Sequence, residues 1–345
     1  MNEKKEWLAT YLYYAEPWEK FLVEVVQPFV ESAFMDGLSE QFFFIRYWER
    51  GPHIRIRFKG DQDILENELR PRLASFFGDY FKRNASVRTE PDWVKNLAED
   101  QQWFPNNSIQ FTEYEPEILR YGGPAGILIS EKQFEISSRC VLSVLKESNP
   151  WDYDRALGAA IQLHLSFASA MGMSLQEAVQ FFSSVSKGWL MSAIGYRQDM
   201  PAKEMRAKKE AILSAFQESF EKQKSTLTSF HRTLWNALGE KATFEQEWLN
   251  VWLEKNSHIS EALSKTQKEG RLILTSDSRA GTEPRGEELS VTVSSILESY
   301  VHMTNNRLGI MNRDEAYLGY LITNSLLSLE SPDKRVKIDV IGGSL

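Results

Sequence analysis

The sequence has few of the residues that build disulfides and metal centres. The 345-residue chain contains one cysteine, Cys140, and five histidines scattered along its length. A single cysteine cannot form an intrachain disulfide, and a Cys/His metal site needs several such ligands at characteristic spacing. We therefore expect no disulfide framework and no bound metal, in a protein suited to a reducing cytoplasm.

Long apolar runs and familiar catalytic motifs are also missing. Eighteen consecutive apolar residues occur nowhere, and the N-terminal sequence MNEKKEWLAT lacks the apolar stretch of a signal peptide. The chain contains no Walker loop, dinucleotide fingerprint, H-E-x-x-H or G-x-S-x-G motif. We therefore expect a cytoplasmic protein that does not span a membrane, and the sequence gives no support to an NTPase, dehydrogenase, zincin or hydrolase.

An excess of positive charge is absent as well. The formal net charge is -8, with 42% hydrophobic and 26% charged residues. Those proportions are typical of a soluble globular protein with a large core. An acidic chain lacks the broad basic surface that binds nucleic acid or an anionic membrane, although a local basic site remains compatible with this balance.

The first part of the chain shows strand and helix patterns in alternation. Aromatic and branched residues at a two-residue period predict strands, and apolar residues at helical spacing predict helices. The short Gly/Pro segment at 49–52 predicts a hairpin between two of the strands. In chain order the predicted elements are a strand at 7–14, a helix at 17–33, strands at 42–48 and 53–59, a helix at 61–83 and a strand at 108–114. This β-α-β-β-α-β order is that of the split βαβ, or ferredoxin-like, pattern.

The remainder of the chain carries helical periodicity without a further pair of strands. The predicted helices cover residues 131–146, 151–173, 175–190, 203–225, 227–238, 244–266, 288–303 and 313–329, with a loop at 275–287. We therefore predict an α+β fold with an α+β part at residues 1–128, a mainly helical part at 129–330 and a flexible tail at 331–345. Because no long linker separates the first two, we expect them to share one interface.

A strand of alternating basic and apolar residues is the most informative segment. Along G-P-H-I-R-I-R-F, residues 51–58, His53, Arg55 and Arg57 share one face of the strand. Same-face neighbours on a strand lie about 7 Å apart, so two guanidiniums side by side could hold a carboxylate. The alternation fits equally well with the wet face of a half-exposed antiparallel sheet.

Two later segments hold further candidates. In Y-E-P-E-I-L-R-Y-G-G-P, residues 114–124, Glu117 and Arg120 are three apart and lie on the same side if the segment makes one helical turn. They could orient each other, or form an ordinary solvated pair. In the stretch at 300–308, His302 has the side chain best suited to proton transfer near neutral pH, yet a histidine on an amphipathic helix is more often simply packed.

The three segments together resemble a known family. G-P-H-I-R-I-R-F, Y-E-P-E-I-L-R-Y-G-G-P and H-M-T-N-N-R-L occur in the order and spacing seen in the C-terminal domain of class I lantibiotic dehydratases, the nisin and subtilin dehydratase type. The likeness covers about residues 7–329. This domain also exists free-standing, as the elimination subunit of split lanthipeptide dehydratases and as the pyridine-forming enzymes of thiopeptide biosynthesis, and we expect a free-standing form here.

The resemblance implies a lyase that eliminates glutamate from glutamylated Ser or Thr of a ribosomal precursor peptide. The expected products are dehydroalanine and dehydrobutyrine, and no cofactor or metal is implied. The expected partners are the glutamylated precursor and a separate glutamylating subunit. Direct nucleic-acid binding is not expected, and homo-oligomerisation stays open.

The family's functional residues map onto named positions of this sequence. The implied catalytic set is Arg55, Arg57, Glu117, Arg120 and His302. The arginines would hold the carboxylate of the glutamyl group, Glu117 would orient an arginine, and His302 would transfer a proton. The implied substrate-binding set is Arg55, Arg57, Arg120, Tyr121, Asn306 and Arg307.

Two other functions stay open from the sequence. One is the [4+2] cycloaddition that forms a pyridine in thiopeptides, and the other is a non-catalytic peptide-binding partner of the glutamylating subunit. The pyridine-forming relatives are expected to have given up much of the elimination set. All five residues of that set are present here, which favours elimination.

Overall fold

The computed structural model describes residues 5–148, 150–274 and 292–330. The described residues divide into two compact units. Unit 1 takes its residues from 1–152 and 261–309, and unit 2 from 153–260 and 310–345.

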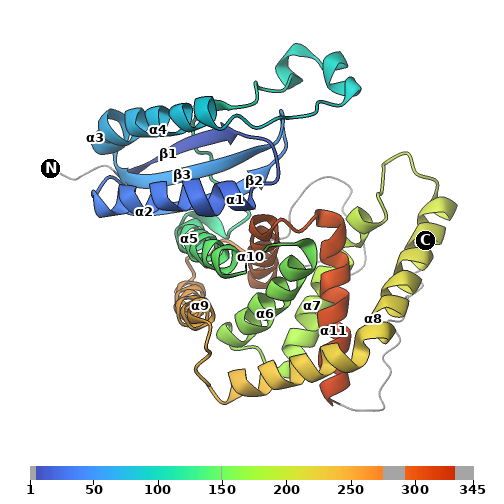
Figure 1. The fold of residues 1–345 in the computed structure, drawn as a ribbon. Helices are drawn as coiled ribbons and strands as arrows, with labels where there is room; N and C mark the ends of the chain where they lie inside the picture. The colour runs from blue at the N-terminus through green and yellow to red at the C-terminus, as the bar shows by residue number, and fades with distance from the viewer. Residues whose placement is uncertain (1–4, 149, 275–291, 331–345) are drawn as a thin grey trace. The chain divides into compact units, whose positions relative to one another are not determined.

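Unit 1 contains a four-stranded antiparallel sheet with the strand order β2-β3-β1-β4 (Figure 1). The strands are β1 (Lys5–Tyr13), β2 (Gln41–Tyr47), β3 (His53–Asp61) and β4 (Ser108–Thr112). The predicted hairpin is present, since β2 and β3 pair antiparallel across residues 48–52. The α+β fold class and the β-α-β-β-α-β order are therefore confirmed.

One face of this sheet is covered by two helices with a shared aromatic core. A first helix runs from α1 (Glu19–Phe21) through a π-helical segment (Leu22–Val26) into α2 (Gln27–Met35). A second runs from α3 (Gln62–Ile64) through another π-helical segment (Leu65–Leu69) into α4 (Arg70–Arg83). The ring of Phe29 on α2 lies 6.0 Å from that of Phe58 on β3 and 5.1 Å from that of Phe77 on α4. Ile54, Ile56 and Phe58 are accordingly fully buried, as expected for the apolar side of an alternating strand.

The helices α5 (Gly123–Glu147) and α10 (Val293–Leu308) pack against the edge strand β2. The backbone groups on the open side of an edge strand need partners outside the sheet. Here the amide of Phe44 donates to Ser138 Oγ on α5 at 3.1 Å, and its carbonyl accepts from Arg307 Nε on α10 at 2.8 Å. Two helices far apart in the sequence thereby close the edge of the sheet.

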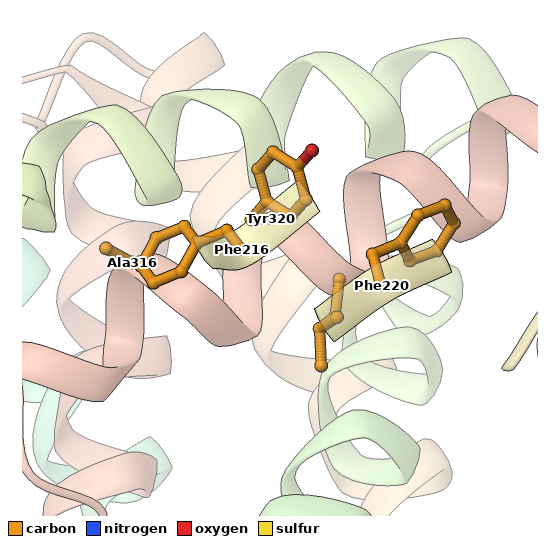
Figure 2. Packing of buried hydrophobic residues seen from close by; sticks show 5 residues of the cluster. Phe216, Phe220, Ala316 and Tyr320 are labelled. Carbon is orange, nitrogen blue, oxygen red and sulfur yellow. The ribbon is translucent and has the colours of Figure 1, made fainter. Parts of the chain in front are cut away.

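Unit 2 contains helices and loops, and no strand occurs among its described residues. It consists of α6 (Tyr153–Ala170), α7 (Leu175–Ala193), α8 (Ala202–Gly239), the first part of α9 (Glu247–Lys268) and α11 (Asn312–Glu330). Figure 2 shows the cluster that α8 and α11 form. Its buried members are Phe216, Phe220, Ala316, Tyr320 and Leu321.

Helices α7 and α11 approach each other closely at a glycine. A Cβ placed on Gly319 would lie 2.9 Å from the amide nitrogen of Ser186 on α7, closer than real Cβ atoms come. Ser186 Oγ also donates to the carbonyl of Ala316 at 2.8 Å. The absence of a side chain at Gly319 therefore lets the two backbones come together.

Among all described residues of the chain, no helix has the length and apolarity needed to span a bilayer.

The observed elements differ from the predicted ones in two places. The two helices predicted at 203–225 and 227–238 form the single 38-residue helix α8. No glycine or proline interrupts this stretch, and Thr226 is no helix breaker, so the change in apolar pattern alone does not end the helix. The boundary predicted at 128/129 falls inside α5, which continues to Glu147 in unit 1. The predicted loop at 275–287 and tail at 331–345 lie outside the described residues.

Candidate active site

The side chains of Arg55 and Arg57 lie on the face of β3 opposite to Ile54, Ile56 and Phe58. Both are half-buried, as the sequence alternation predicted. The register places Tyr11 of β1 and Ile45 of β2 beside Arg55, and Ala9 and Phe43 beside Arg57. This face is therefore a row of cations set among aromatic and apolar side chains.

Arg55 is held between two tyrosine rings. The guanidinium carbon lies 3.5 Å from the ring centroid of Tyr47 and 4.4 Å from that of Tyr11. At its edges, Nε donates to His53 Nε2 at 3.0 Å and a terminal nitrogen donates to Glu49 Oε2 at 3.1 Å. Stacked rings cover the faces of a guanidinium and leave its planar edge for hydrogen bonds. Arg55, with 14% of its side chain exposed, is thus oriented before any ligand binds.

Arg57 is held by aromatic rings, and its Nε has no hydrogen-bonded partner among the described residues. Its guanidinium carbon lies 4.9 Å from the ring centroid of Tyr114 and 5.1 Å from that of Phe43. Its Nε is buried and donates to none of the described residues. Burial lowers the pKa of Arg57, while the nearby phenol of Tyr114 and the charge of Glu117 act in the opposite direction. An anionic ligand that reached this half-buried cation would supply the acceptor that its buried Nε lacks among the described residues.

The third cation on this face, Lys59, already has its own carboxylate. Lys59 Nζ lies 3.0 Å from Oε2 of Glu131, a buried residue of α5, and 5.2 Å from the ring centroid of Trp7. The charge of Lys59 is therefore compensated by a carboxylate of the protein, in contrast to that of Arg57. Burial and the charge of Glu131 also raise the pKa of Tyr114, so the Tyr114 phenol stays protonated.

The segment that connects β4 to α5 forms a compact turn. The amide of Tyr121 donates to the carbonyl of Glu117 at 3.3 Å, which is one helical turn, and the amide of Gly123 donates to that of Ile118 at 2.9 Å. This turn brings a terminal nitrogen of Arg120 to 3.4 Å from Glu117 Oε1. The side chains are 37% and 60% exposed, so the pair contributes little stability by itself.

Arg120 links this turn to the helix that carries His302. Arg120 Nε donates to Ser299 Oγ on α10 at 3.3 Å. Ser299 and His302 are three residues apart and therefore lie on the same side of α10. Arg120 thus contacts a serine that lies one helical turn from the half-buried His302.

Two glycines after Arg120 make the turn possible. Gly122 and Gly123 have φ angles of +81° and +86°, which residues with a side chain rarely adopt. A Cβ on Gly123 would lie 2.7 Å from side-chain atoms of Ile273, and one on Gly122 would lie 3.1 Å from Ile296 Cδ1. The Gly-Gly-Pro sequence therefore fixes both the turn and the packing of α10 against it.

Tyr121 forms a wall beside this turn. Its ring is almost fully buried and stacks on Tyr300 of α10, with centroids 6.1 Å apart and planes at 13°. Burial raises the pKa of Tyr121 to about 12, so its phenol remains neutral. The charges of Arg120 and Glu117 also act on this phenol, which places all three side chains in one neighbourhood.

Asn306 and Arg307 are engaged with the backbone of β2. Asn306 accepts from the amide of Arg46 through Oδ1 and donates to the Arg46 carbonyl through Nδ2, both at 2.9 Å. Arg307 is fully buried and donates to the carbonyl of Phe44. A bound peptide could reach either side chain only if these bonds were broken. Asn306 and Arg307, predicted to bind substrate, instead hydrogen-bond the backbone of β2.

The arrangement joins most of the predicted catalytic residues within unit 1. The charges of Arg55 and Glu117 act on Arg57, and Arg120 connects Glu117 to the helix of His302. The residues of this site that sequence reasoning missed are Tyr11, Tyr47, Tyr114 and Glu131. Strand register could have found Tyr11, which lies directly opposite Arg55, but no local pattern marks Glu131. Among the described residues, no group of three His, Cys, Asp or Glu side chains is placed to hold a metal ion.

The chain belongs to the lantibiotic biosynthesis dehydratase C-terminal family, which matches residues 7–326. It is also similar to the subtilin biosynthesis protein SpaB of Bacillus subtilis, with 30% identity over 146 residues. That match covers 41% of this chain and 12% of SpaB, so the chain corresponds to a small part of that relative. The family resemblance inferred from the three motifs is therefore confirmed.

Solved structures show the same fold at low sequence identity. The pyridine synthase TbtD from thiomuracin biosynthesis aligns with a TM-score of 0.71 and 17% identity, over 94% of this chain and 98% of TbtD. The tRNA-dependent lantibiotic dehydratase MibB from Microbispora sp. 107891 aligns with a TM-score of 0.59 and 18% identity, over 97% of this chain and 29% of MibB. The fold is thus shared by proteins described as a pyridine synthase and as a dehydratase.

Proposed function

We propose that this chain eliminates glutamate from glutamylated Ser and Thr residues of a ribosomal precursor peptide, leaving dehydroalanine or dehydrobutyrine. The observation that carries the proposal is Arg57, a half-buried cation whose buried Nε has no acceptor among the described residues and which lies beside the preoriented Arg55. Two such guanidiniums suit a glutamyl carboxylate. Membership of the lantibiotic dehydratase family supports the same chemistry.

The reaction needs from the protein a base, stabilisation of enolate-like charge and a site for the departing carboxylate. The base takes the Cα proton, the bond between Cβ and the ester oxygen breaks, and the electron pair of that bond leaves on the glutamate carboxylate. Enolate-like charge develops meanwhile on the neighbouring peptide carbonyl, and fixed positive charge nearby stabilises it. The products are the alkene and free glutamate, so neither a redox partner nor a cofactor is required.

The proposed roles follow the placement of the side chains. Arg55, Arg57 and Arg120 hold the glutamyl group and stabilise the departing carboxylate. Glu117 orients Arg120 through their 3.4 Å contact. His302, one helical turn from the serine that Arg120 contacts, transfers the proton, either from Cα or to the leaving group.

The proposal implies two partners. The substrate is a precursor peptide that already carries glutamate, and a separate protein supplies that glutamate. MibB, whose fold this chain shares in part, is described as a tRNA-dependent lantibiotic dehydratase, which supports a substrate that has already been aminoacylated. The proposed substrate is thus an aminoacylated peptide and not a nucleic acid.

A mass-spectrometric assay tests the proposal. A precursor glutamylated at one Ser is incubated with the purified chain, and we expect the peptide to lose the mass of glutamic acid while free glutamate appears. Because one preorganised donor is typically worth about 10²–10³ in rate, Arg57→Ala and Arg120→Ala should slow elimination by that order. His302→Ala should also slow it strongly.

The matched control is Arg72→Ala. Arg72 forms an exposed ion pair with Asp36 at 2.6 Å on the helix-covered side of the sheet, so its loss should leave elimination unchanged. Parent-like rates in Arg57→Ala would contradict the carboxylate clamp. Parent-like turnover in His302→Ala would contradict the proton-transfer role.

A second candidate is the pyridine-forming cycloaddition, which the fold likeness to TbtD keeps in consideration. That reaction joins two dehydroalanines and expels a leader peptide, so it needs no carboxylate clamp. Incubation with a precursor that already contains two dehydroalanines separates the two functions. Ring formation there, with the glutamylated peptide left intact, would favour cycloaddition. Binding of the glutamylated peptide without any change in its mass would indicate a non-catalytic partner.

A further inference from the structure

His53 is a buried histidine with both ring nitrogens engaged. It is fully enclosed at the start of β3, with its ring 4.5 Å from that of Tyr13 and 5.0 Å from that of Tyr11. Nδ1 lies 2.7 Å from the carbonyl oxygen of Gly51, and Nε2 lies 3.0 Å from Arg55 Nε. The ring therefore connects the hairpin turn to the first arginine of the candidate site.

These two contacts fix the tautomer of His53. A carbonyl oxygen only accepts hydrogen bonds, so Nδ1 must carry the hydrogen. The Nε of arginine only donates, so Nε2 must offer its lone pair. Burial lowers the pKa of His53 to about 4, with the charges of Arg55 and Arg57 acting in the same direction, so the ring is neutral near pH 7. A lone pair already occupied by Arg55 leaves His53 no role as the base of the reaction.

The bond to His53 also decides which edge of Arg55 can meet a ligand. A guanidinium can grip a carboxylate along its Nε side or along its two terminal nitrogens. Here His53 occupies Nε, and the rings of Tyr11 and Tyr47 lie close to the guanidinium carbon. Only the edge formed by the two terminal nitrogens is left to bind a carboxylate. Glu49 contacts this edge through one hydrogen bond.

We propose that His53 is a positioning residue, which acts as the neutral Nδ1–H tautomer to hold Arg55 so that its terminal edge faces the substrate carboxylate. This inference rests on the proposed elimination function, because the carboxylate is that of the glutamyl group. His53 stabilises the geometry of Arg55 and does not itself touch the reacting atoms.

The bond itself is tested on the unliganded protein by nitrogen NMR with ¹⁵N-labelled histidine and arginine. We expect the His53 ring to show a protonated Nδ1 and an unprotonated Nε2 at pH 7, with a coupling or shift change at Arg55 Nε that disappears in His53→Asn. A protonated Nε2 would overturn the proposal, because the ring could then not accept from Arg55.

The function of the bond is tested with two amide variants. The side-chain amide of His53→Asn replaces Nδ1 and can still reach Gly51, whereas the Oε1 of His53→Gln replaces Nε2 and can still accept from Arg55. Both place an amide in the same buried site, so they control for each other. We expect kcat for elimination to fall about tenfold to a hundredfold in His53→Asn, because a misdirected catalytic group costs that order. In His53→Gln we expect most of the parent rate.

The outcomes separate this inference from the proposed function. Equal loss of activity in both variants would show that His53 acts only through packing and would overturn the positioning role. A parent protein that leaves the glutamylated peptide intact would overturn the elimination function and with it the carboxylate that Arg55 is said to face. In that case the NMR measurement still decides whether His53 holds Arg55.

Discussion

Two regions of unit 1 contain buried arginines, and they use them differently. On β3, Arg55 and Arg57 lie between aromatic rings, and Arg57 donates no hydrogen bond to a described residue. At the edge of β2, Arg307 donates through Nε and one terminal nitrogen to Phe44 O, Ser138 Oγ, Ser137 Oγ and Met303 O. Arg46 beside it donates to the carbonyl of Arg307 and to Glu19.

Burial alone does not distinguish the two regions. It lowers the pKa of Arg46, Arg57 and Arg307 alike, in the last case to about 9. The acceptors distinguish them. Carbonyls, hydroxyls and the carboxylate of Glu19 accept from the β2-edge arginines, and one terminal nitrogen of each, Nη2, is left unpaired among the described residues. The Nε of Arg57 has no described acceptor, and aromatic rings lie beside its guanidinium. We therefore propose that Arg57 is the arginine prepared for a ligand, whereas the hydrogen bonds of Arg46 and Arg307 connect β2 to its neighbouring helices.

The sharpest test of this difference is Arg57→Met. This substitution should lower the rate of elimination by a factor of about 10²–10³, because it removes a preorganised donor. The free energy of unfolding should stay the same or increase, since replacing a buried charge by an apolar side chain of similar volume is often neutral or stabilising. Urea denaturation and the elimination assay on the same preparation measure both. A large loss of stability would show that Arg57 is structural after all.

Arg307→Met should give the opposite result. We expect the free energy of unfolding to fall by about 2–4 kcal/mol, because buried acceptors such as the Phe44 carbonyl lose their donor. Protein that remains folded should eliminate glutamate at a rate close to the parent's. The same two measurements apply. A selective loss of elimination with unchanged stability would return Arg307 to the substrate-binding set.

A fall in pH should lower the free energy of unfolding, because His53 beside Arg55 is buried in its neutral form. Its pKa is about 4 when folded, against 6.5 for the unperturbed side chain, so the unfolded state binds the extra proton between these values. Stability from this group is therefore complete above pH 6.5 and decreases as the pH falls toward 4. Between pH 7 and 5 the loss amounts to about 2 kcal/mol.

This acid dependence is measured by urea denaturation at pH 7 and pH 5. His53→Gln, which does not titrate, should reduce the loss of stability between the two pH values by about 2 kcal/mol relative to the parent. An identical pH dependence in the variant would show that the imidazole is charged within the fold.

The smallest predicted effect concerns the carboxylate already beside Arg55. Glu49 pairs with the terminal edge of Arg55 at 3.1 Å while its own side chain is mostly exposed. Because exposed ion pairs are worth about 0–1 kcal/mol, Glu49→Gln should lower the KM for the glutamylated peptide by no more than about fivefold. Steady-state kinetics at low salt would detect this. An increase in KM would mean that Glu49 helps substrate binding and does not compete with it.

Much of the fold could be predicted because its signals are local. The two-residue period at 53–59 and the turn residues at 49–52 specify a hairpin without knowledge of distant contacts. The prediction was less accurate where the signal was indirect. A change of apolar pattern suggested two helices where α8 is continuous, and the change of character after Tyr114 suggested a boundary that α5 crosses.

The candidate site was predictable to the extent that its motifs are contiguous. The motifs supplied Arg55, Arg57, Glu117, Arg120 and His302, and the structure adds the contacts that connect Glu117, Arg120 and α10. The same motif that contains His302 also contains Asn306 and Arg307. Their side chains form hydrogen bonds to the backbone of β2, which lies about 260 residues away in the sequence. A motif does not separate residues that contact a ligand from those that support them.

The sequence by itself determined the family, the order of strands and helices along the first part of the chain and the side of β3 on which the arginines lie, because motifs and periodicity are properties of neighbouring residues. Tertiary structure alone decided which guanidiniums have acceptors. Arg57 and Arg307 are equally charged in the sequence. In the fold, β2 and α5 supply a carbonyl and a hydroxyl to Arg307, whereas the rings of Phe43 and Tyr114 lie beside Arg57. Hydrogen bonding depends on contacts between distant segments, and those exist only in the folded chain.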